Sequence, residues 1–160
     1  MHHTKNDIPL EKRSAAISLL NSYLASFLDL ILQFRQAHWN VKGPQFISLH
    51  KLFESIADEL VEASDTIAER ITALGGTAEG TISVIAVKTI LPSYSLTIYQ
   101  GKESLEALSN SLSVLGKSIR KGIVQTEDLE DAGTTDLLTG LSRDLDKKLW
   151  LIEAHLQSDK

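Results

Sequence analysis

Apolar residues recur every three or four positions through most of the chain, the spacing that gathers them on one face of an α-helix. The first stripe predicts a helix from about Ser14 to Val41, and Gly43-Pro44 ends it. The second stripe predicts a helix from about Phe46 to Leu74, followed by two glycines that suit a helix C-terminus. The N-terminal half of the chain is therefore predicted to be a pair of long helices.

The C-terminal half carries two further stripes. One of them, from Leu105 to Ile119, predicts a third helix, and an acidic loop over 126–133 separates it from a fourth. The fourth helix is expected to begin at Thr134 or Thr135, because a threonine hydroxyl can cap the first free N–H groups of a helix. Its apolar seam continues to Leu156.

A long connection over 75–99 joins the second helix to the third, and it contains Gly80, Pro92 and the β-branched stretch 82–90. An up-and-down bundle needs only a short loop here, whereas a long crossover is typical of ferritin-like bundles. The predicted fold class is therefore all-α, a ferritin-like four-helix bundle whose crossover can hold a short helix. Residues 1–13 are interpreted as a flexible N-terminal tail and residues 14–157 as one domain.

The composition narrows the chemistry. A chain of 160 residues with 42% hydrophobic and 23% charged residues fits one soluble domain. The polar N-terminus does not resemble a signal peptide and no apolar run approaches the ~20 residues of a membrane span, so a cytoplasmic protein without a membrane partner is expected. Without cysteine, any metal site must use His, Asp and Glu. The net charge of −5 favours cations over nucleic acid as partners.

The second helix carries a polar stripe beside its apolar seam. The stripe consists of one histidine and five carboxylates: His50, Glu54, Asp58, Glu62, Asp65 and Glu69. A solvated acidic face is one interpretation. Metal binding is the other, because His50 and Glu54 lie four residues apart, a chelating spacing on one helix face, and Asp65 and Glu69 repeat it.

The two pairs cannot bind the same ion within one chain. Their centres lie 15 residues apart, which is ~22 Å along a helix that rises about 1.5 Å per residue. Either the helix holds two incomplete half-sites, or it pairs antiparallel with its copy in another subunit. Around such a two-fold axis, the first pair of one chain would meet the second pair of the other, which gives each dimer two equivalent sites.

His38 continues the inward stripe of the first helix, seven residues after Ile31. A single histidine on an apolar face is more often a buried core residue than a metal ligand. Beside a carboxylate-rich stripe, however, His38 adds a second imidazole to a mixed nitrogen and oxygen donor set that suits Fe(II). His2, His3 and His155 have no such neighbours and are interpreted as surface residues.

Specific motifs in these helices resemble the Dps family, the DNA-binding proteins from starved cells. The similarity lies in the segments Ala37-His-Trp-Asn-Val-Lys-Gly43, Phe46-Ile47, His50, Glu54, Asp65-Thr-Ile-Ala-Glu-Arg70 and Leu74-Gly-Gly76. In the last helix, Ser142-Arg-Asp-Leu-Asp-Lys147 and Leu149-Trp-Leu-Ile-Glu153 are similar to the same family. The resemblance covers about residues 14–156.

The resemblance implies a homo-oligomer, a hollow dodecamer built from two-fold dimers, with a ferroxidase centre between subunits. Its iron ligands, which are also its catalytic residues, carry over to five positions: His38, His50, Glu54, Asp65 and Glu69. Glu54 is a mild departure, because the family commonly has Asp there, and Trp39 matches a tryptophan beside the centre. The family oxidises Fe(II) with hydrogen peroxide in preference to dioxygen and stores the ferric product, which protects DNA from oxidative damage.

The resemblance also implies a negatively charged pore at a three-fold axis, lined by Asp136, through which Fe(II) reaches the interior. Glu130 and Asp131 lie close by in the sequence and are further candidates for the pore. The alternative for all three is ordinary loop polarity together with a favourable charge at a helix N-terminus.

DNA binding in this family usually depends on a lysine-rich tail. Here the basic residues Lys5, Lys12 and Arg13 face two carboxylates, a net charge of +1 for residues 1–13, so weak or absent binding is expected, with nucleoid association only if DNA is bound. Two other functions stay open. A di-iron oxygenase on the same bundle uses Glu-x-x-His motifs, which this sequence lacks. A DNA-compacting architectural oligomer would leave the metal stripe idle.

Overall fold

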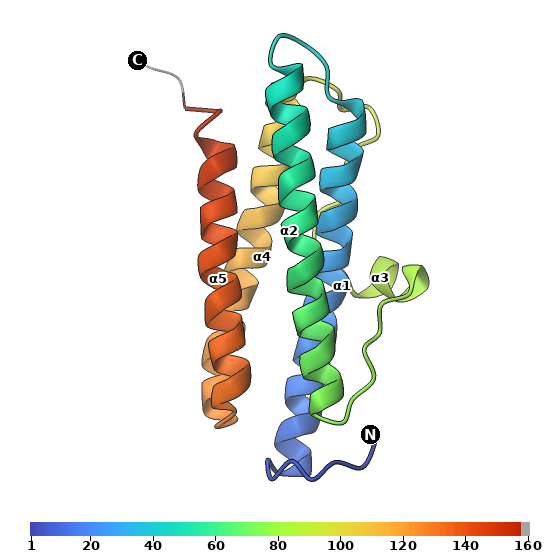
Figure 1. Ribbon diagram of the computed structural model, residues 1–160, viewed down its shortest axis with the longest axis vertical. Coiled ribbons are helices and arrows are strands. Elements are labelled where there is room, and N and C mark those ends of the chain that lie inside the picture. The colour runs from blue at the N-terminus through green and yellow to red at the C-terminus, as the bar shows by residue number, and fades with distance from the viewer. Residues whose placement is uncertain (158–160) are drawn as a thin grey trace.

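The computed structural model describes residues 1–157, and the regular elements of this part of the chain are helices (Figure 1). In chain order they are α1 (Leu10–Asn40), α2 (Phe46–Ala73), α3 (Ile82–Lys88), α4 (Gly101–Asp128) and α5 (Ala132–Glu153). The four long helices form the bundle, and α3 lies beside it in the crossover (Figure 1). The predicted all-α bundle with a short helix in a long crossover is confirmed.

The bundle consists of two helical hairpins. α1 packs along α2 and α4 packs along α5, with sparser contact between the two hairpins. After α2, the crossover runs back along the bundle past α3 before α4 begins, so α2 and α4 point in the same direction (Figure 1). Residues 74–100 cover this return path, which explains why the connection is long.

The core is built from the apolar seams of the long helices, as the hydrophobic periodicity predicted. Phe34 and Phe53 meet edge to face within the first hairpin, with ring centroids 6.1 Å apart. Tyr23 ties this hairpin to the second, because its hydroxyl donates to the backbone oxygen of Ser118 at 2.9 Å. Its ring lies so close to Gly122 that a Cβ there would overlap it, so the approach of α1 to α4 requires glycine at that position.

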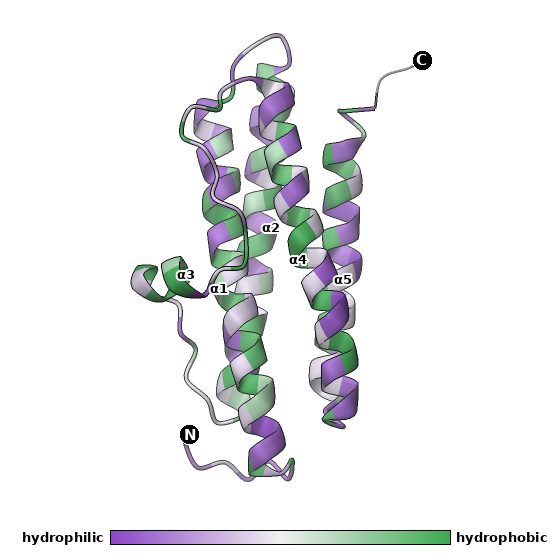
Figure 2. Ribbon diagram, turned by 180° about the vertical axis from the view of Figure 1, so that it is seen from behind, coloured by the Kyte–Doolittle hydropathy of each residue, from purple (hydrophilic) through white to green (hydrophobic). Residues whose placement is uncertain are grey.

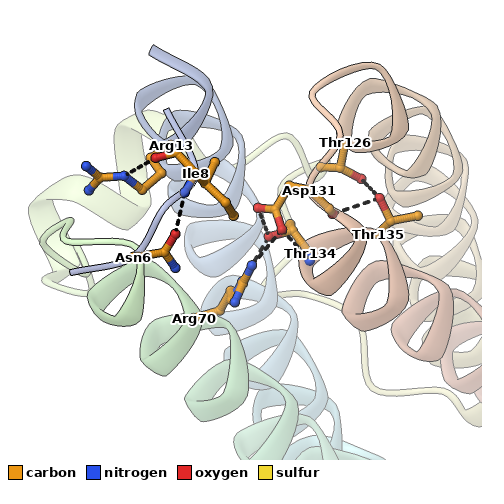
Figure 3. A network of polar contacts seen from close by, with 8 residues as sticks. All are labelled: Asn6, Ile8, Arg13, Arg70, Thr126, Asp131, Thr134 and Thr135. Atoms are coloured by element: carbon orange, nitrogen blue, oxygen red, sulfur yellow. Dashed lines mark hydrogen bonds and ion pairs between the residues drawn. The ribbon is translucent and has the colours of Figure 1, made fainter. Parts of the chain in front are cut away.

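Two cations tie α2 to α5. Lys148 is only 1% exposed, and its ammonium group donates to Glu59 at 2.8 Å and to Asp144 at 2.6 Å. The hydrogen bond from Lys148 holds the pKa of Glu59 below its ordinary value. Further along α2, Arg70 donates to the buried carboxylate of Asp131 at 2.6 Å (Figure 3). Buried charges are tolerated only when paired, so these contacts fix how the hairpins dock.

α1 contains a stretch that is long and apolar enough, by length and composition, to cross a membrane. This differs from the expectation that no apolar run approaches such a length. Half of the stretch is buried inside the chain, and α1 lies against α2 in the bundle (Figure 1). The apolar residues of α1 are therefore those of a core helix.

α1 begins four residues earlier than its apolar stripe predicted, at Leu10 instead of Ser14. Leu10 is exposed, so the buried apolar stripe does not extend into this first turn. The residue in the sequence that marks the start of the helix is Pro9, directly before Leu10. The N–H of His2 donates to the backbone oxygen of Gly75 at 2.7 Å. The predicted flexible tail is thus partly helical and partly fastened to the C-terminal end of α2.

The predicted acidic loop over 126–133 is mostly helical, since α4 continues to Asp128 and α5 begins at Ala132. Its first residue, Thr126, is fully buried and takes a place in the seam of α4 that apolar periodicity could not reveal. Glu130 then reverses the chain in a left-handed conformation, with φ of 57°. The turn between the two helices is therefore much shorter than expected.

The N-cap of α5 is Asp131, and the prediction of Thr134 or Thr135 was wrong. The Asp131 carboxylate accepts the backbone N–H of Thr134 at 3.0 Å, while it also accepts the hydrogen bond from Arg70 (Figure 3). The Thr135 hydroxyl donates instead to Thr126 Oγ1 at 3.0 Å. One buried carboxylate thus both starts α5 and binds it to α2.

α3 and the following loop display large apolar side chains on the surface. Ile82, Val87 and Leu96 are all more than four-fifths exposed, and the apolar character of α3 is visible in Figure 2. Monomeric soluble proteins rarely expose a sizeable apolar patch without a function.

Candidate metal centre

The turn between α1 and α2 brings two histidines together. His38 lies in the last turn of α1 and is 7% exposed, and His50 lies in the second turn of α2 and is half-buried. Their rings stack with centroids 3.8 Å apart and planes inclined by 21°. The two imidazoles that the sequence selected on separate helices are thus direct neighbours.

Reciprocal hydrogen bonds fix both rings. Nδ1 of His38 lies 2.8 Å from the backbone oxygen of His50, and Nδ1 of His50 lies 2.9 Å from the backbone oxygen of His38. A carbonyl oxygen only accepts, so each Nδ1 must carry the proton and donate it. In an uncharged imidazole this leaves the Nε2 lone pair free, which is the arrangement that backbone partners impose on metal-binding histidines.

Glu54 follows His50 by one turn of α2 and is exposed. Within residues 1–157, its carboxylate forms no hydrogen bond or ion pair with another side chain, and no three His, Asp or Glu side chains converge on one point. One chain therefore offers two oriented imidazoles and a nearby carboxylate, which fits the nitrogen and oxygen donors that Fe(II) takes but leaves the set incomplete.

Asp65 and Glu69 lie further along α2, and both side chains are exposed. In the described part of the chain neither carboxylate has a hydrogen-bonding or ion-pair partner. Because they share a straight helix with His50, they cannot approach it within the same chain. The structure therefore keeps the two predicted pairs apart, as the spacing required.

Two aromatic side chains border the histidines. Trp39 is 67% exposed and directly follows His38, as the sequence indicated. Phe46 was not predicted as part of the site, yet its ring centroid lies 5.1 Å from that of His50. Its spacing of four residues from His50 on one helix was the available signal. His2, His3 and His155 lie on the surface, as predicted.

Arg35 is a second residue near the histidines that the sequence did not single out. It lies one turn before His38 on α1, and its guanidinium forms an ion pair with Asp58 on α2. Asp58 belongs to the polar stripe and lies one turn after Glu54. A cation paired with Asp58 therefore lies beside the proposed donors.

The acidic residues near the start of α5 separate into two groups. Glu130 and Asp136 line one surface depression of about 540 Å³, together with Glu127 and Thr135. Asp131 does not join them, because it is 1% exposed and serves as the N-cap of α5. The structure thus brings together two of the three predicted pore residues and gives the third a role in the fold.

The basic residues of the N-terminal segment are largely engaged within the chain. Arg13 donates to the backbone oxygen of Ile8 at 2.9 Å (Figure 3). It also donates to the backbone oxygen of Leu74 at 2.9 Å. Lys12 forms an ion pair with Glu130, and this partner lowers the pKa of the Glu130 carboxylate. Lys5 is exposed.

A protein family, individual relatives and solved structures all match this chain over most of its length. The ferritin-like domain family matches residues 17–160. A "DNA protection during starvation protein" from Agrobacterium fabrum is 45% identical over 156 residues, which cover 98% of this chain and 96% of that protein. A relative with the same description from Mycolicibacterium smegmatis is 33% identical and covers 92% of this chain and 80% of its own length.

Solved structures agree. Mycobacterium smegmatis Dps superposes with a TM-score of 0.93 at 32% identity, covering 99% of this chain and 95% of that one. The DPS protein from Vibrio cholerae O1, described as a member of a broad superfamily of ferritin-like diiron-carboxylate proteins, gives a TM-score of 0.92 at 25% identity, with 98% of each chain covered. The helical bundle and its long crossover are therefore shared over nearly the whole chain.

Proposed function

Because the chain belongs to the Dps family of ferritin-like proteins, we propose that it is a ferroxidase that oxidises Fe(II) with hydrogen peroxide and stores the ferric product. Iron storage and DNA protection are the general functions of this family. We propose that this protein carries out iron storage and DNA protection in the cytoplasm. Iron is here the substrate and the stored material.

The observation that carries the proposal is the pair of reciprocal hydrogen bonds between His38 and His50. Each hydrogen bond keeps the ring proton on Nδ1. The lone pair of Nε2 is then available to a metal ion. Because both rings stack on one another and are held in the same way, the two Nε2 atoms belong to one fixed unit. Together with Glu54, the pair supplies half of a mixed nitrogen and oxygen site for Fe(II).

We infer that Asp65 and Glu69 of a second subunit complete the centre. Their side chains are exposed and lack partners within residues 1–157, and an antiparallel pairing of two α2 helices brings the two pairs together. The apolar side chains exposed on α3 support contact between subunits. A hollow dodecamer built from such two-fold dimers accounts for storage as well as oxidation.

The reaction proposed at the centre is a two-electron reduction of peroxide. Two Fe(II) ions give one electron each to one hydrogen peroxide molecule, the O–O bond breaks, and both oxygens leave as hydroxide or water. The resulting Fe(III) hydrolyses to an oxyhydroxide and releases protons. Both reagents of hydroxyl-radical formation are consumed, which is how this activity would protect DNA.

We further propose that Asp136 lines the path by which Fe(II) enters the shell. Glu130 lines the same depression, but its ion pair with Lys12 offsets its charge. Around a three-fold axis Asp136 would be present three times, and the summed negative potential would attract Fe(II). Asp131 is left out of this proposal, because its carboxylate is buried and paired with Arg70.

A DNA-compacting architectural role is the second candidate function, and the N-terminal segment argues against it. Arg13 and Lys12 are engaged with backbone oxygens and with Glu130, so few cations remain for phosphates. We expect weak or absent binding of duplex DNA in a gel-shift assay at pH 7 and physiological salt. Tight binding that survives deletion of residues 1–13 would require a basic surface elsewhere on the shell.

The decisive experiment is stopped-flow oxidation of Fe(II) by peroxide with the assembled protein, alongside a measurement of particle mass. The wild-type chain should oxidise Fe(II) far faster than buffer does and leave a soluble ferric core. His38→Ala and Asp65→Ala should each slow the fast phase while the particle mass stays unchanged. If both variants oxidise iron at the wild-type rate, the ligand assignment is wrong.

A further inference from the structure

We propose that Arg35 is a positioning residue of the metal centre, which holds Asp58 in an ion pair and so keeps a fourth carboxylate from the bound cations. This inference rests on the proposed function, because it concerns the affinity of the centre formed by His38, His50 and Glu54 with its partner carboxylates. Neither residue is among the predicted ligands.

The geometry sets the pair beside the donors. Arg35 precedes His38 by three residues on α1, and Asp58 follows Glu54 by four residues on α2. Their ion pair therefore bridges α1 and α2 one helical turn from the donors on each helix. The Arg35 side chain is 28% exposed against 63% for Asp58, so the cation is the more firmly held partner.

The position of Asp58 on α2 is what gives the pair its effect. At about 100° per residue, Asp58 lies roughly 40° around the helix from Glu54 and roughly 20° from Asp65, on the same face as both. Along the axis it is only ~6 Å from Glu54. Of the five carboxylates in the stripe, Asp58 is the one that has an ion-pair partner within residues 1–157. Without Arg35, its charge would act on the centre unopposed.

The charge of the centre determines whether the first or the second bound cation is more sensitive to the charge of Asp58. Three carboxylates and two uncharged imidazoles give the shared centre three negative charges. One divalent cation leaves one of these charges, and a second cation reverses the sign. The second cation is therefore bound against a nearly neutral centre, and one extra carboxylate changes its affinity strongly. By neutralising Asp58, Arg35 keeps this second position weak, which suits a centre that must pass iron on to a mineral.

The test is titration of the assembled, iron-free protein with Co²⁺ in the absence of oxidant, followed by calorimetry and by the visible absorption of bound Co²⁺. Arg35→Gln should bind the second Co²⁺ roughly five- to tenfold more tightly at low ionic strength, and the gain should shrink with added salt. Arg35→Lys, which keeps the charge, should stay near the wild-type affinity. Asp58→Asn leaves Arg35 unopposed and should weaken the second Co²⁺.

The double variant Arg35→Gln with Asp58→Asn removes both charges and should return close to the wild-type affinity. Arg120→Gln is the matched control, because Arg120 forms a similar exposed ion pair with Asp146 on the α4–α5 hairpin. It should leave Co²⁺ binding unchanged. A structural role for Arg35 alone would lower the melting temperature and leave both Co²⁺ affinities as they were, which would overturn the inference.

His38→Ala separates this inference from the proposed function. If His38→Ala abolishes Co²⁺ binding while Arg35→Gln and Asp58→Asn leave it unchanged, the centre exists and Arg35 does not tune it. If His38→Ala leaves Co²⁺ binding unchanged, the proposed centre fails and the inference about Arg35 falls with it.

Discussion

At the start of α2, His50 stacks on His38 of α1, and hydrogen bonds to backbone oxygens fix both rings. Near its end, Asp65 and Glu69 project from the surface and, within residues 1–157, have no partner. The same helix thus carries oriented nitrogen donors at one end and an exposed, unpaired set of oxygen donors at the other, within the described residues. Imidazole binds metal in one direction only, so it profits from being held, whereas a carboxylate can adjust to an ion that arrives.

This difference explains how one helix can serve two sites. The histidine end depends on contacts inside its own chain, so it is built when the subunit folds. The carboxylate end has no use for such contacts, because its partner atoms belong to a different subunit in the proposed assembly. A substitution at one end should therefore leave the other end intact.

The largest expected effect comes from disabling each end completely. Chains with His50→Ala and Glu54→Ala, and chains with Asp65→Ala and Glu69→Ala, should each be nearly inactive as ferroxidases, because every shared site loses half its ligands. Reassembly of the two in equal amounts gives mixed dimers for roughly half of the pairs. One site in each mixed dimer then receives both intact halves, so about a quarter of all sites should recover.

Recovery in the mixing experiment is measured as the amplitude of the fast phase of Fe(II) oxidation. Native mass spectrometry supplies the control by showing that mixed dimers are present. If mixed dimers form and no activity returns, each site is built within one chain and the shared centre is refuted.

The second effect is on stability, and it should appear at only one end. His38→Ala removes a buried ring and leaves the backbone oxygen of His50 without its donor, so it should lower the free energy of unfolding by about 1–3 kcal/mol. Asp65→Ala, on an exposed position, should change it by less than about 0.5 kcal/mol. Urea unfolding of both variants under metal-free conditions measures the contrast. Equal losses would mean that the carboxylate end is also held by contacts within the chain.

The residues that the sequence placed correctly are those that lie on helical stripes. The bounds of α2 differ from the prediction by one residue, and His38 and His50 were selected from spacing alone before their contact was known. The orientation of their rings could not be predicted, because it depends on the turn between α1 and α2 bringing two backbone oxygens within reach. Arg35 was missed for the same reason, since its partner Asp58 lies on the other helix.

The errors at the start of α5 have a different physical cause. In the sequence Asp131 is one more residue of an acidic loop, yet it is buried and paired with Arg70, which lies 61 residues earlier in the chain. Asp and Thr are both favourable N-cap residues, which the local sequence shows. It does not show which of them lies next to a cation from another part of the chain. Tertiary contact decided between them.

A smaller effect is expected when the acidic surface at the start of α5 is altered and the metal centre is left unchanged. Asp136→Asn should slow Fe(II) uptake several-fold at low salt and little at high salt, because a long-range potential is screened within roughly 10 Å at 0.1 M ionic strength. The affinity of the centre for Co²⁺ should stay unchanged. Stopped-flow uptake at increasing sodium chloride measures it, and a rate independent of Asp136 at every ionic strength would remove the pore from the proposal.

The smallest expected effect concerns Glu59, which lies on α2 midway between the two ends. Lys148 lowers its pKa, so the stabilisation from this pair is present above the ordinary carboxyl pKa of 4.5 and is lost as pH falls through the lowered value. Glu59→Gln should therefore melt below the wild type at neutral pH, and the difference should shrink in acid. Glu62→Gln, one turn further on, is the control and should show no such trend. A difference that persists unchanged to about pH 3 would contradict the assignment.

The division of the bundle into two hairpins also sets an order of events during synthesis. α1 and α2 are neighbours in the chain and pack along one another, so we expect this hairpin to form before α4 and α5 leave the ribosome. All five proposed ligands lie on it. The second hairpin adds none of them; it is synthesised later and closes the core against a hairpin that already carries every proposed ligand.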